Sequence, residues 1–344
     1  SETDPYDFGS VTVNGQETHT FTITNTGGVS ATSVGGSGLT APFTFFGGSF
    51  PGTGGTCGGT IGAGSNCNVV VAYNPTVTGT LSDTFDINFF DGAAAGTSSR
   101  DVQGTGIAPA TITISESDPY DFGLIAAGGT TTHTFTLTNS GASAASALSE
   151  VGLAAPFDFL GGSYPGTGGD CGATLAAGGG NCTIVLEYAP PGTGVDSDTI
   201  DISYNDGAVA QNSTRDVQGT AGVPATLDFA DAPLYDYLTQ PNGSNVDYTF
   251  TINNSGAVTA TAMADSLNMA APFTFKGGTY PGVGGDCGTT LAAAGSCDVV
   301  VTYSPIATGT QTDQIDLNFN NGAIVTNTTL AVSYTHLRAH ETLP

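Results

Sequence analysis

The sequence predicts an all-β chain built from three tandem copies of one module. A cysteine-containing stretch occurs three times, at residues 47–75, 161–190 and 277–305. The first cysteines of these stretches, Cys57, Cys171 and Cys287, lie 114 and 116 residues apart. Self-similarity at a fixed period indicates a repeat architecture. Between the repeated stretches, short runs alternate apolar and polar residues and no helical period is sustained, which is typical of β-strands separated by turns.

The period divides the chain into three modules of roughly 110 residues, a usual size for a domain with its own core. We expect module 1 at residues 1–107, module 2 at 108–222 and module 3 at 223–331. Module 2 opens with the alternating run ATITI, directly before SESDPYD, whereas module 1 starts with the matching SETDPYD. We therefore expect module 1 to lack its opening strand and module 3 to be cut at its C-terminal end.

The next strand reads HTFTITN at residues 19–25, HTFTLTN at 133–139 and YTFTINN at 248–254. Its apolar residues share one parity and its threonines the other, which predicts a half-buried strand. His19 and His133 fall on the apolar parity, where module 3 has Tyr248. We interpret both histidines as aromatic residues at the edge of the core rather than as metal ligands.

A short APF strand and the cysteine strand follow in each module. The proline of APFTF or APFDF suits a sheet edge or a strand start, and its two phenylalanines share a face. The second cysteine begins a run of the form Cys-x-apolar-x-apolar-x-Tyr, whose parity points the cysteine inward.

We predict one disulfide within each module, pairing Cys57 with Cys67, Cys171 with Cys182 and Cys287 with Cys297. Closing a loop of about ten residues stabilises a module by about 2.5–3 kcal/mol on the chain-entropy model. The alternative is two buried thiols per module, and a zinc site lacks further ligands nearby. Paired cysteines also indicate an oxidising compartment.

The last hairpin of each module contains the runs DTFDINFFDG, DTIDISYNDG and DQIDLNFNNG, at residues 83–92, 198–207 and 313–322. Their closing Asp-Gly or Asn-Gly pairs predict tight turns. In the first two modules a final strand, RDVQGT, then leads into a short proline linker, which indicates semi-rigid stacking of the modules.

The C-terminal residues depart from the repeat. NTTLAV at 327–332 aligns with NSTRDV at 212–217, so Gln-Gly-Thr is expected next, but the chain continues as SYTHLRAHETLP. The run VSYTHLRAHET resembles the translation of a sequencing-library adapter. We therefore interpret residues 332–344 as non-native.

The charge is strongly acidic, with 30 Asp and Glu against 4 Lys and Arg and a formal net charge of −26. This balance argues against nucleic-acid partners and anionic membrane surfaces, and no apolar run is long enough to span a bilayer. We interpret the acid as a solubilising, self-repelling surface. Calcium is the one cofactor left open, at carboxylates near the module junctions. These candidates are Asp4, Asp7, Asp118, Asp121, Asp231 and Asp236.

No nucleophile elbow or phosphate-binding loop is present, so the sequence predicts no catalytic residue. The ordered motifs DFG, F-T-I/L-T-N, APF, C-x-V-x-V-x-Y-x-P and V-x-G-T together resemble the ASH/Hydin-like immunoglobulin modules. More narrowly, they resemble the bacterial choice-of-anchor D repeats. The resemblance implies an immunoglobulin-like β-sandwich in each module and a large secreted or surface-anchored bacterial protein, extracellular or periplasmic.

We therefore expect a non-enzymatic stalk or adhesin-like spacer whose modules contact one another. The alternatives are a module that binds a peptide by β-strand addition and a calcium-stiffened adhesin array. The expected outside partner is a surface or extracellular protein or a glycan.

Overall fold

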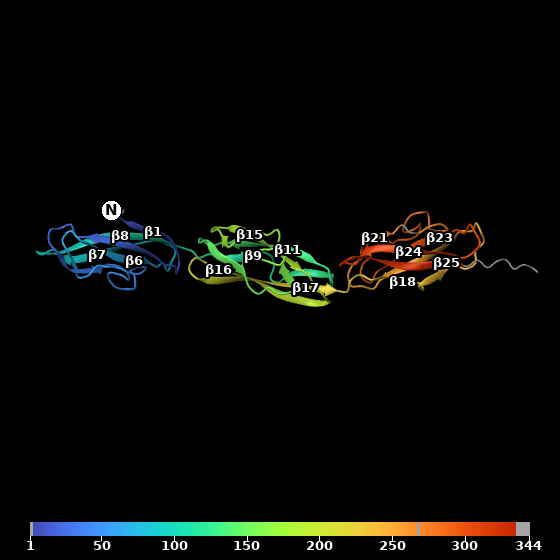
Figure 1. Cartoon of the computed structure of the whole chain (residues 1–344), viewed down its shortest axis with the longest axis horizontal. Helices are drawn as coiled ribbons and strands as arrows, with labels where there is room; N and C mark the ends of the chain where they lie inside the picture. Colours follow the sequence, from blue (N-terminus) through green and yellow to red (C-terminus); the bar gives the residue numbers. More distant parts are fainter. Residues whose placement is uncertain (1–2, 267–268, 335–344) are drawn as a thin grey trace, which may run out of the picture.

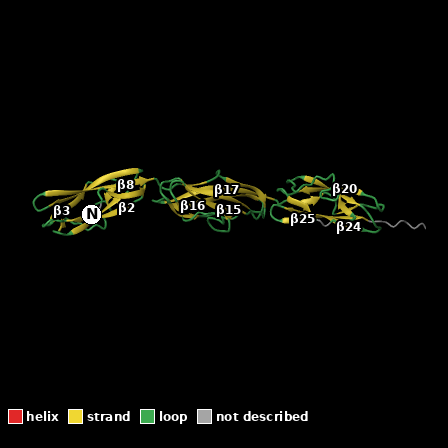
Figure 2. Ribbon diagram, turned by 90° about the horizontal axis from the view of Figure 1, so that it is seen from above, coloured by secondary structure: helices red, strands yellow, loops and turns green. Residues whose placement is uncertain are grey.

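The computed structural model describes residues 3–266 and 269–334 of the chain. These residues form strands, turns and loops, with no helix among them (Figure 2). The strands build three sandwiches that lie end to end in one row (Figure 1). The fold is thus all-β, with three tandem immunoglobulin-like sandwiches.

Module 2 shows the complete arrangement of two facing sheets. Its strands are β9 (Ile112–Ile114), β10 (Tyr120–Ala126), β11 (Thr131–Asn139), β12 (Ala145–Glu150), β13 (Phe157–Phe159), β14 (Thr174–Leu175), β15 (Gly180–Tyr188), β16 (Gly194–Asn205) and β17 (Ala210–Gly222). One sheet has the order β10-β17-β16-β12-β14 and the other β13-β15-β11-β9. The pair β10–β17 is parallel, and the other pairs of module 2 are antiparallel.

Module 3 repeats this plan with fewer strands. They are β18 (Leu227–Phe229), β19 (Leu234–Asp236), β20 (Val246–Asn254), β21 (Thr261–Asp265), β22 (Phe273–Phe275), β23 (Ser296–Tyr303), β24 (Gln311–Asn320) and β25 (Val325–Tyr334). The two sheets have the orders β19-β25-β24-β21 and β18-β20-β23-β22.

Module 1 differs at one sheet edge. Its strands are β1 (Tyr6–Thr12), β2 (Glu17–Thr24), β3 (Ala31–Ser37), β4 (Phe43–Phe45), β5 (Thr60–Ile61), β6 (Asn66–Tyr73), β7 (Gly79–Phe90) and β8 (Ala95–Ile107). The first sheet has the order β1-β8-β7-β3-β5, but the second is only β2-β6-β4. Strand β2 therefore forms a sheet edge in the described part of module 1. The equivalent strands β11 and β20, in modules 2 and 3, are each paired with an opening strand.

Each module has its own hydrophobic core. The inward parity of the cysteine strand ends on a tyrosine that is fully buried in every module, namely Tyr73, Tyr188 and Tyr303. The rings of Tyr73 and Tyr188 lie where a Cβ on Gly104 or Gly219 would stand. Only glycine at these positions lets the tyrosine ring pack so close to the backbone.

Module 3 fills the same place with Tyr334, whose ring centroid lies 4.8 Å from that of Tyr303. Strand β25 thus continues past residue 331, the predicted end of module 3, and Val332 and Tyr334 belong to its core. The reason is that β25 stays paired with β24 as far as Tyr334, which lies opposite Gln311. The rest of the stretch interpreted as non-native, residues 335–344, lies outside the described residues.

The hairpin turns are longer than a two-residue turn. Strand β7 ends at Phe90 and β8 begins at Ala95, and the Asp91 N–H donates to Ala94 O at 3.0 Å. The Asp91 carboxylate accepts the Ala93 and Ala94 N–H groups, both at 2.7 Å. Of Asp91 and Gly92, only Gly92 has a positive φ, at 98°. The aspartate therefore shapes the loop through its side chain.

Candidate functional site

The contact between modules 1 and 2, here called seam 1, brings together three residues distant in sequence. The hydroxyl oxygens of Thr12 and Ser143 are 2.6 Å apart and share a buried hydrogen bond. Gly207, with φ +102°, lies against Thr12, so closely that a Cβ at Gly207 would meet the Thr12 hydroxyl. Seam 1 is therefore a direct, close-packed contact.

The contact between modules 2 and 3, seam 2, uses the corresponding positions with apolar side chains. A Cβ on Gly322 would lie 2.8 Å from Ala126 Cβ and 3.2 Å from Val258 Cγ2. Ala126, Val258 and Gly322 occupy the places of Thr12, Ser143 and Gly207 in the repeat. The seam is thus part of the repeated plan rather than an accident of one junction.

The linkers are fixed by hydrogen bonds to the module that follows them. The Ser143 N–H donates to Ala108 O at 3.0 Å, and the Ala110 N–H donates to Asp206 O at 2.9 Å. At seam 2 the Ala257 N–H donates to Val223 O, also at 2.9 Å. A linker whose backbone is bonded in this way cannot swivel freely.

The three predicted cysteine pairs are joined in the structure, each within one module: Cys57–Cys67, Cys171–Cys182 and Cys287–Cys297. All six residues are buried. Each bond ties the long loop after the APF strand to the start of a core strand, β6, β15 or β23. The disulfides therefore stabilise modules one by one and do not cross a seam.

A buried asparagine holds the linker end of modules 2 and 3. Asn139 is 0% exposed, and its amide nitrogen donates to Ser143 O and Ala176 O at 2.9 and 3.1 Å. Its side-chain oxygen accepts the N–H groups of Thr111 and Gly141. The asparagine thus joins the opening strand to two loops.

Asn254 repeats this pattern in module 3, where it is 1% exposed. No local sequence pattern marks the role of these residues, although an Asn ends the F-T-x-T/N-N run in each module.

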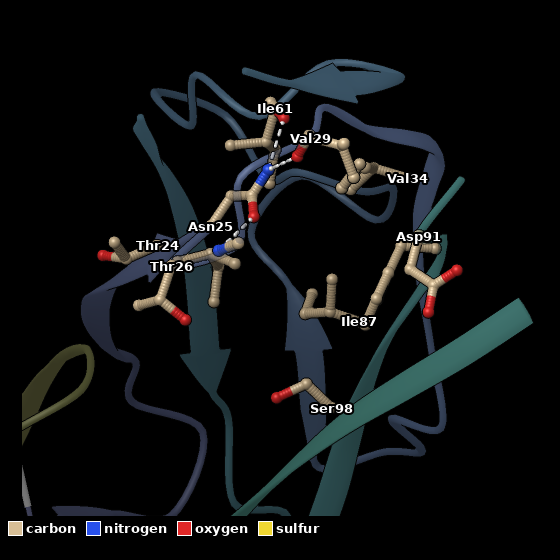
Figure 3. Close-up of a pocket in the computed structure, with 13 residues that line it drawn as sticks. Thr24, Asn25, Thr26, Val29, Val34, Ile61, Ile87, Asp91 and Ser98 are labelled. Atoms are coloured by element: carbon tan, nitrogen blue, oxygen red, sulfur yellow. Dashed lines mark hydrogen bonds between the residues drawn. The ribbon is translucent and has the colours of Figure 1, made fainter. Parts of the chain in front are cut away.

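The equivalent position in module 1 lies in an open groove of about 330 Å³ (Figure 3). Asn25 is only half-buried here, and its amide nitrogen donates to Val29 O and Ile61 O at 2.8 and 3.0 Å. The walls are mostly apolar, and Figure 3 shows Val34 and Ile87 between the Asn25 side and the Asp91 side. Backbone N–H groups of Ala94 and Ala93 lower the pKa of the Asp91 carboxyl at this end.

The candidate calcium carboxylates are engaged in local hydrogen bonds. Asp4 and Asp118 accept the N–H groups of Asp101 and Asp216 at 3.1 and 3.0 Å. The same carboxylates lie 3.7 and 4.0 Å from the guanidinium groups of Arg100 and Arg215. Each pair therefore ties the start of a module to its last strand.

The remaining candidates also bond to nearby groups. Asp7 and Asp121 accept a glycine N–H and a glutamine side-chain amide, Asp231 accepts the Tyr248 hydroxyl, and Asp236 accepts the Leu238 N–H. Within residues 3–266 and 269–334, no group of three or more His, Cys, Asp or Glu is placed to hold a metal ion.

The histidines stack on aromatic rings, as the parity predicts. The His19 ring centroid lies 3.9 Å from that of Tyr6, and the His133 centroid lies 4.1 Å from that of Tyr120. In module 3, Tyr248 and Tyr235 form the same stack at 3.8 Å. The interpretation of both histidines as aromatic edge residues is confirmed.

Buried and half-buried tyrosines have strongly raised pKa values. Tyr237 donates its hydroxyl to Val301 O at 3.1 Å, and burial raises its pKa. Burial, with a smaller contribution from Asp265, raises the pKa of Tyr280 to about 12. These phenols stay neutral at ordinary pH and act as structural groups.

The paired sheets and the seams define a chain of immunoglobulin-like sandwiches, a class of structural or binding modules. Residues 2–105 of this chain match the sequence model of the HYDIN/CFA65/VesB-like, Ig-like domain. A search of curated proteins found no match. Among the described residues, no helix is long and apolar enough to cross a bilayer.

Solved structures with similar parts include the VesB protease of Vibrio cholerae, at 19% identity and a TM-score of 0.27 over 33% of this chain and 32% of that one. The chain thus spans about a third of VesB. The ASH/PapD-like domain 7 of human CEP192 matches at 14% identity and a TM-score of 0.25, over 34% of this chain and 89% of that one. A mutated three-domain titin segment, I67–I69, matches at 10% identity and a TM-score of 0.32 over 97% of both chains.

Proposed function

We propose that this chain is a non-enzymatic spacer region, stalk-like or adhesin-like, of a larger secreted or surface-anchored bacterial protein. The observation that carries the proposal is the repeated seam. Seam 1 and seam 2 use the same three positions, and the linker of each is bonded to the following module. Such an array keeps its two ends apart, which is the task of a spacer.

Two further features support this role. Disulfides within each module suit an oxidising space outside the cytosol. The net charge of −26 repels neighbouring copies and keeps stalks separate. The motif resemblance to choice-of-anchor D repeats agrees with a place on the bacterial surface.

Small-angle X-ray scattering of the whole chain tests the spacer proposal. A compact 344-residue domain has a radius of gyration of about 20 Å. We expect a clearly larger value and the distance distribution of a rod, unchanged between low and moderate salt. A radius of gyration near the compact value, or a profile of freely jointed beads, would contradict the proposal.

A further inference from the structure

Module 2 lies between two other modules, so tension along the row enters it through one linker and leaves it through the other (Figure 1). The linker at residues 108–110 leads into β9 and β10, and the linker at 223–225 follows β17. Tension therefore pulls on β9, β10 and β17, here called the loaded strands. The way in which these strands are joined decides how strongly the module resists being pulled open.

Strands β10 and β17 are joined in a direction that resists tension. They are parallel neighbours, with Tyr120 opposite Val217 and Ala126 opposite Gly222. Pulling on both linkers draws the start of β10 and the end of β17 in opposite directions along the strands. Because the hydrogen bonds of the ladder run across the strands, they share this load and must break together. A pair of strands peeled apart from one end would instead lose its bonds one at a time.

Strand β9 is held on both of its sides. On one side it pairs with β11, where Ile112 lies opposite Asn139. On the other side the Ile112 carbonyl accepts the Ser213 hydroxyl at 2.9 Å, and the Ile112 N–H donates to the Tyr204 hydroxyl at 3.3 Å. Ile112 and Ile114 are 5% and 4% exposed. Sliding β9 along its axis would therefore also draw two apolar side chains out of the core.

The side chain of Arg215, on β17, joins the loaded strands to one another. Its guanidinium group donates to the carbonyl of Ile114, the last residue of β9. The guanidinium also lies 4.0 Å from the Asp118 carboxylate, which accepts the Asp216 N–H of β17 at 3.0 Å. The Arg215 side chain is only 15% exposed. It therefore ties the end of β9 and the segment before β10 to the last strand of the module.

Module 3 has no arginine at the matching position. Leu330 stands in the place of Arg215, and Pro233 stands in the place of Asp118. Leu330 is 2% exposed, and its side chain has no donor. Strand β19 still pairs in parallel with β25, but over three residue pairs, compared with five between β10 and β17. Two modules of the same fold thus differ in how their first strands are held.

We propose that this chain bears tension, and that the Arg215 guanidinium is a latch that holds module 2 closed under load. Module 2 should yield first where the loaded strands are joined, and it should resist longer than module 3. This function deepens the spacer proposal and rests on it, because a tether is a spacer that is pulled. Scattering and pulling can fail separately, since a flexible row can resist tension and a stiff row can unfold under a small force.

Single-molecule pulling of the whole chain at constant force tests the latch. The reference chain carries Cys171→Ala and Cys182→Ala, which frees a loop outside the loaded strands. These cysteines are 11 residues apart in sequence and 4.9 Å apart between Cα atoms. At roughly 3.6 Å per extended residue, the freed loop lengthens the step of module 2 by about 35 Å. Each long step then reports one unfolding event of module 2 and shows that this module was folded.

In the reference chain, Arg215→Leu should make the long step at least about tenfold faster at the same force. The reason is that a hydrogen bond from a charged group is lost between the loaded strands. Arg215→Lys keeps the charge without the forked donors, so it should give a smaller increase. The Lys variant also keeps the test decisive if the Leu variant gives no long step.

The matched control is Asn212→Ala, on the same strand as Arg215. The Asn212 amide donates to both oxygens of the Asp201 carboxylate, at 2.8 and 3.0 Å, and so joins β17 to β16. Strand β16 carries neither linker, so this contact is still intact when the loaded strands separate. We expect the rate of the long step to change by less than about twofold.

The order of the steps gives a second measurement. The long step should seldom come first in the reference chain, because module 3 lacks the latch, and should come first more often after Arg215→Leu. The proposal is overturned if Arg215→Leu leaves the rate of the long step unchanged, or if Asn212→Ala raises it equally. It is also overturned if the long step already comes first in most pulls of the reference chain.

Discussion

At the scale of the residue, one asparagine in modules 2 and 3 ties the linker that leads into the opening strand to two loops. Asn139 and Asn254 satisfy carbonyl groups in two loops and accept N–H groups from the linker side. A buried polar group of this kind stabilises only because its partners are complete. Asn25 bonds to one carbonyl in each of the two corresponding loops, but it has no linker to hold among the described residues.

Replacing Asn139 by Ala should therefore cost more than replacing Asn25. Asn139→Ala leaves buried carbonyls and N–H groups unsatisfied, so we expect module 2 to lose about 2–4 kcal/mol of unfolding free energy. Asn25→Ala should cost module 1 about 0.5–1.5 kcal/mol, because water reaches the freed groups. Denaturant unfolding followed by hydrogen exchange in each module measures both. Equal losses in the two modules would contradict this account.

The roles of some residues can be predicted from the sequence, and the roles of others cannot. The places of His19 and His133 follow from strand parity, which is a local property. The partners of Asn139 lie at residues 111, 143 and 176, on separate loops. No local pattern brings these positions together, so the role of the asparagine becomes visible only in the folded module.

At the scale of the element, each disulfide acts on one loop and one core strand. Cys171 and Cys182 are 11 residues apart and Cys57 and Cys67 are 10 apart, so the closed loops are nearly equal. Loop-closure entropy then predicts nearly equal stabilisation.

Changing both cysteines of one pair to Ala should lower the unfolding free energy of that module by about 2.5–3 kcal/mol. The Cys57→Ala/Cys67→Ala chain should lose stability in module 1 only, and the Cys171→Ala/Cys182→Ala chain in module 2 only. Calorimetry of both chains and of the combined variant checks this, and the two losses should add. A loss that spreads into the unchanged modules would show that the seams couple their unfolding.

Most elements follow from the sequence because alternation and cysteine spacing are local signals. The APF strands lie at sheet edges in all three modules, as the proline predicts. The two-residue strands β5 and β14 carry too few residues to show a period. The parallel pairing of β1 with β8 joins Tyr6 to Val102, and such a long-range register cannot be read from either strand alone.

At the scale of the whole molecule, one surface of the repeat is covered in two modules and open in the third. In modules 2 and 3 the preceding module and its linker cover one end of the sandwich. This end carries the buried Asn, the Ser or Val of the seam and the hairpin Gly. In module 1 the same end is the open groove. The covered seams and the open groove are therefore two environments of one repeated surface.

A charged side chain introduced where this surface is covered should separate the two modules that meet there. The same change where the surface is open should leave the arrangement of the modules unchanged. Ser143→Asp puts a carboxylate at a 5% exposed position against Thr12, and burying an unpaired charge costs several kcal/mol. We expect opening seam 1 to cost less than that, because it breaks one side-chain hydrogen bond. We therefore expect modules 1 and 2 to separate and move independently while both remain folded.

The matched variant is Val29→Asp, at the same repeat position in module 1 but 59% exposed. Spin labels on modules 1 and 2 report the result as a distance distribution, which should broaden for Ser143→Asp and stay narrow for Val29→Asp. Circular dichroism and hydrogen exchange establish that each module keeps its fold. A distribution equally narrow in both variants would mean that the seam does not set the geometry, and the stiffness of the array would then have to come from the linkers alone.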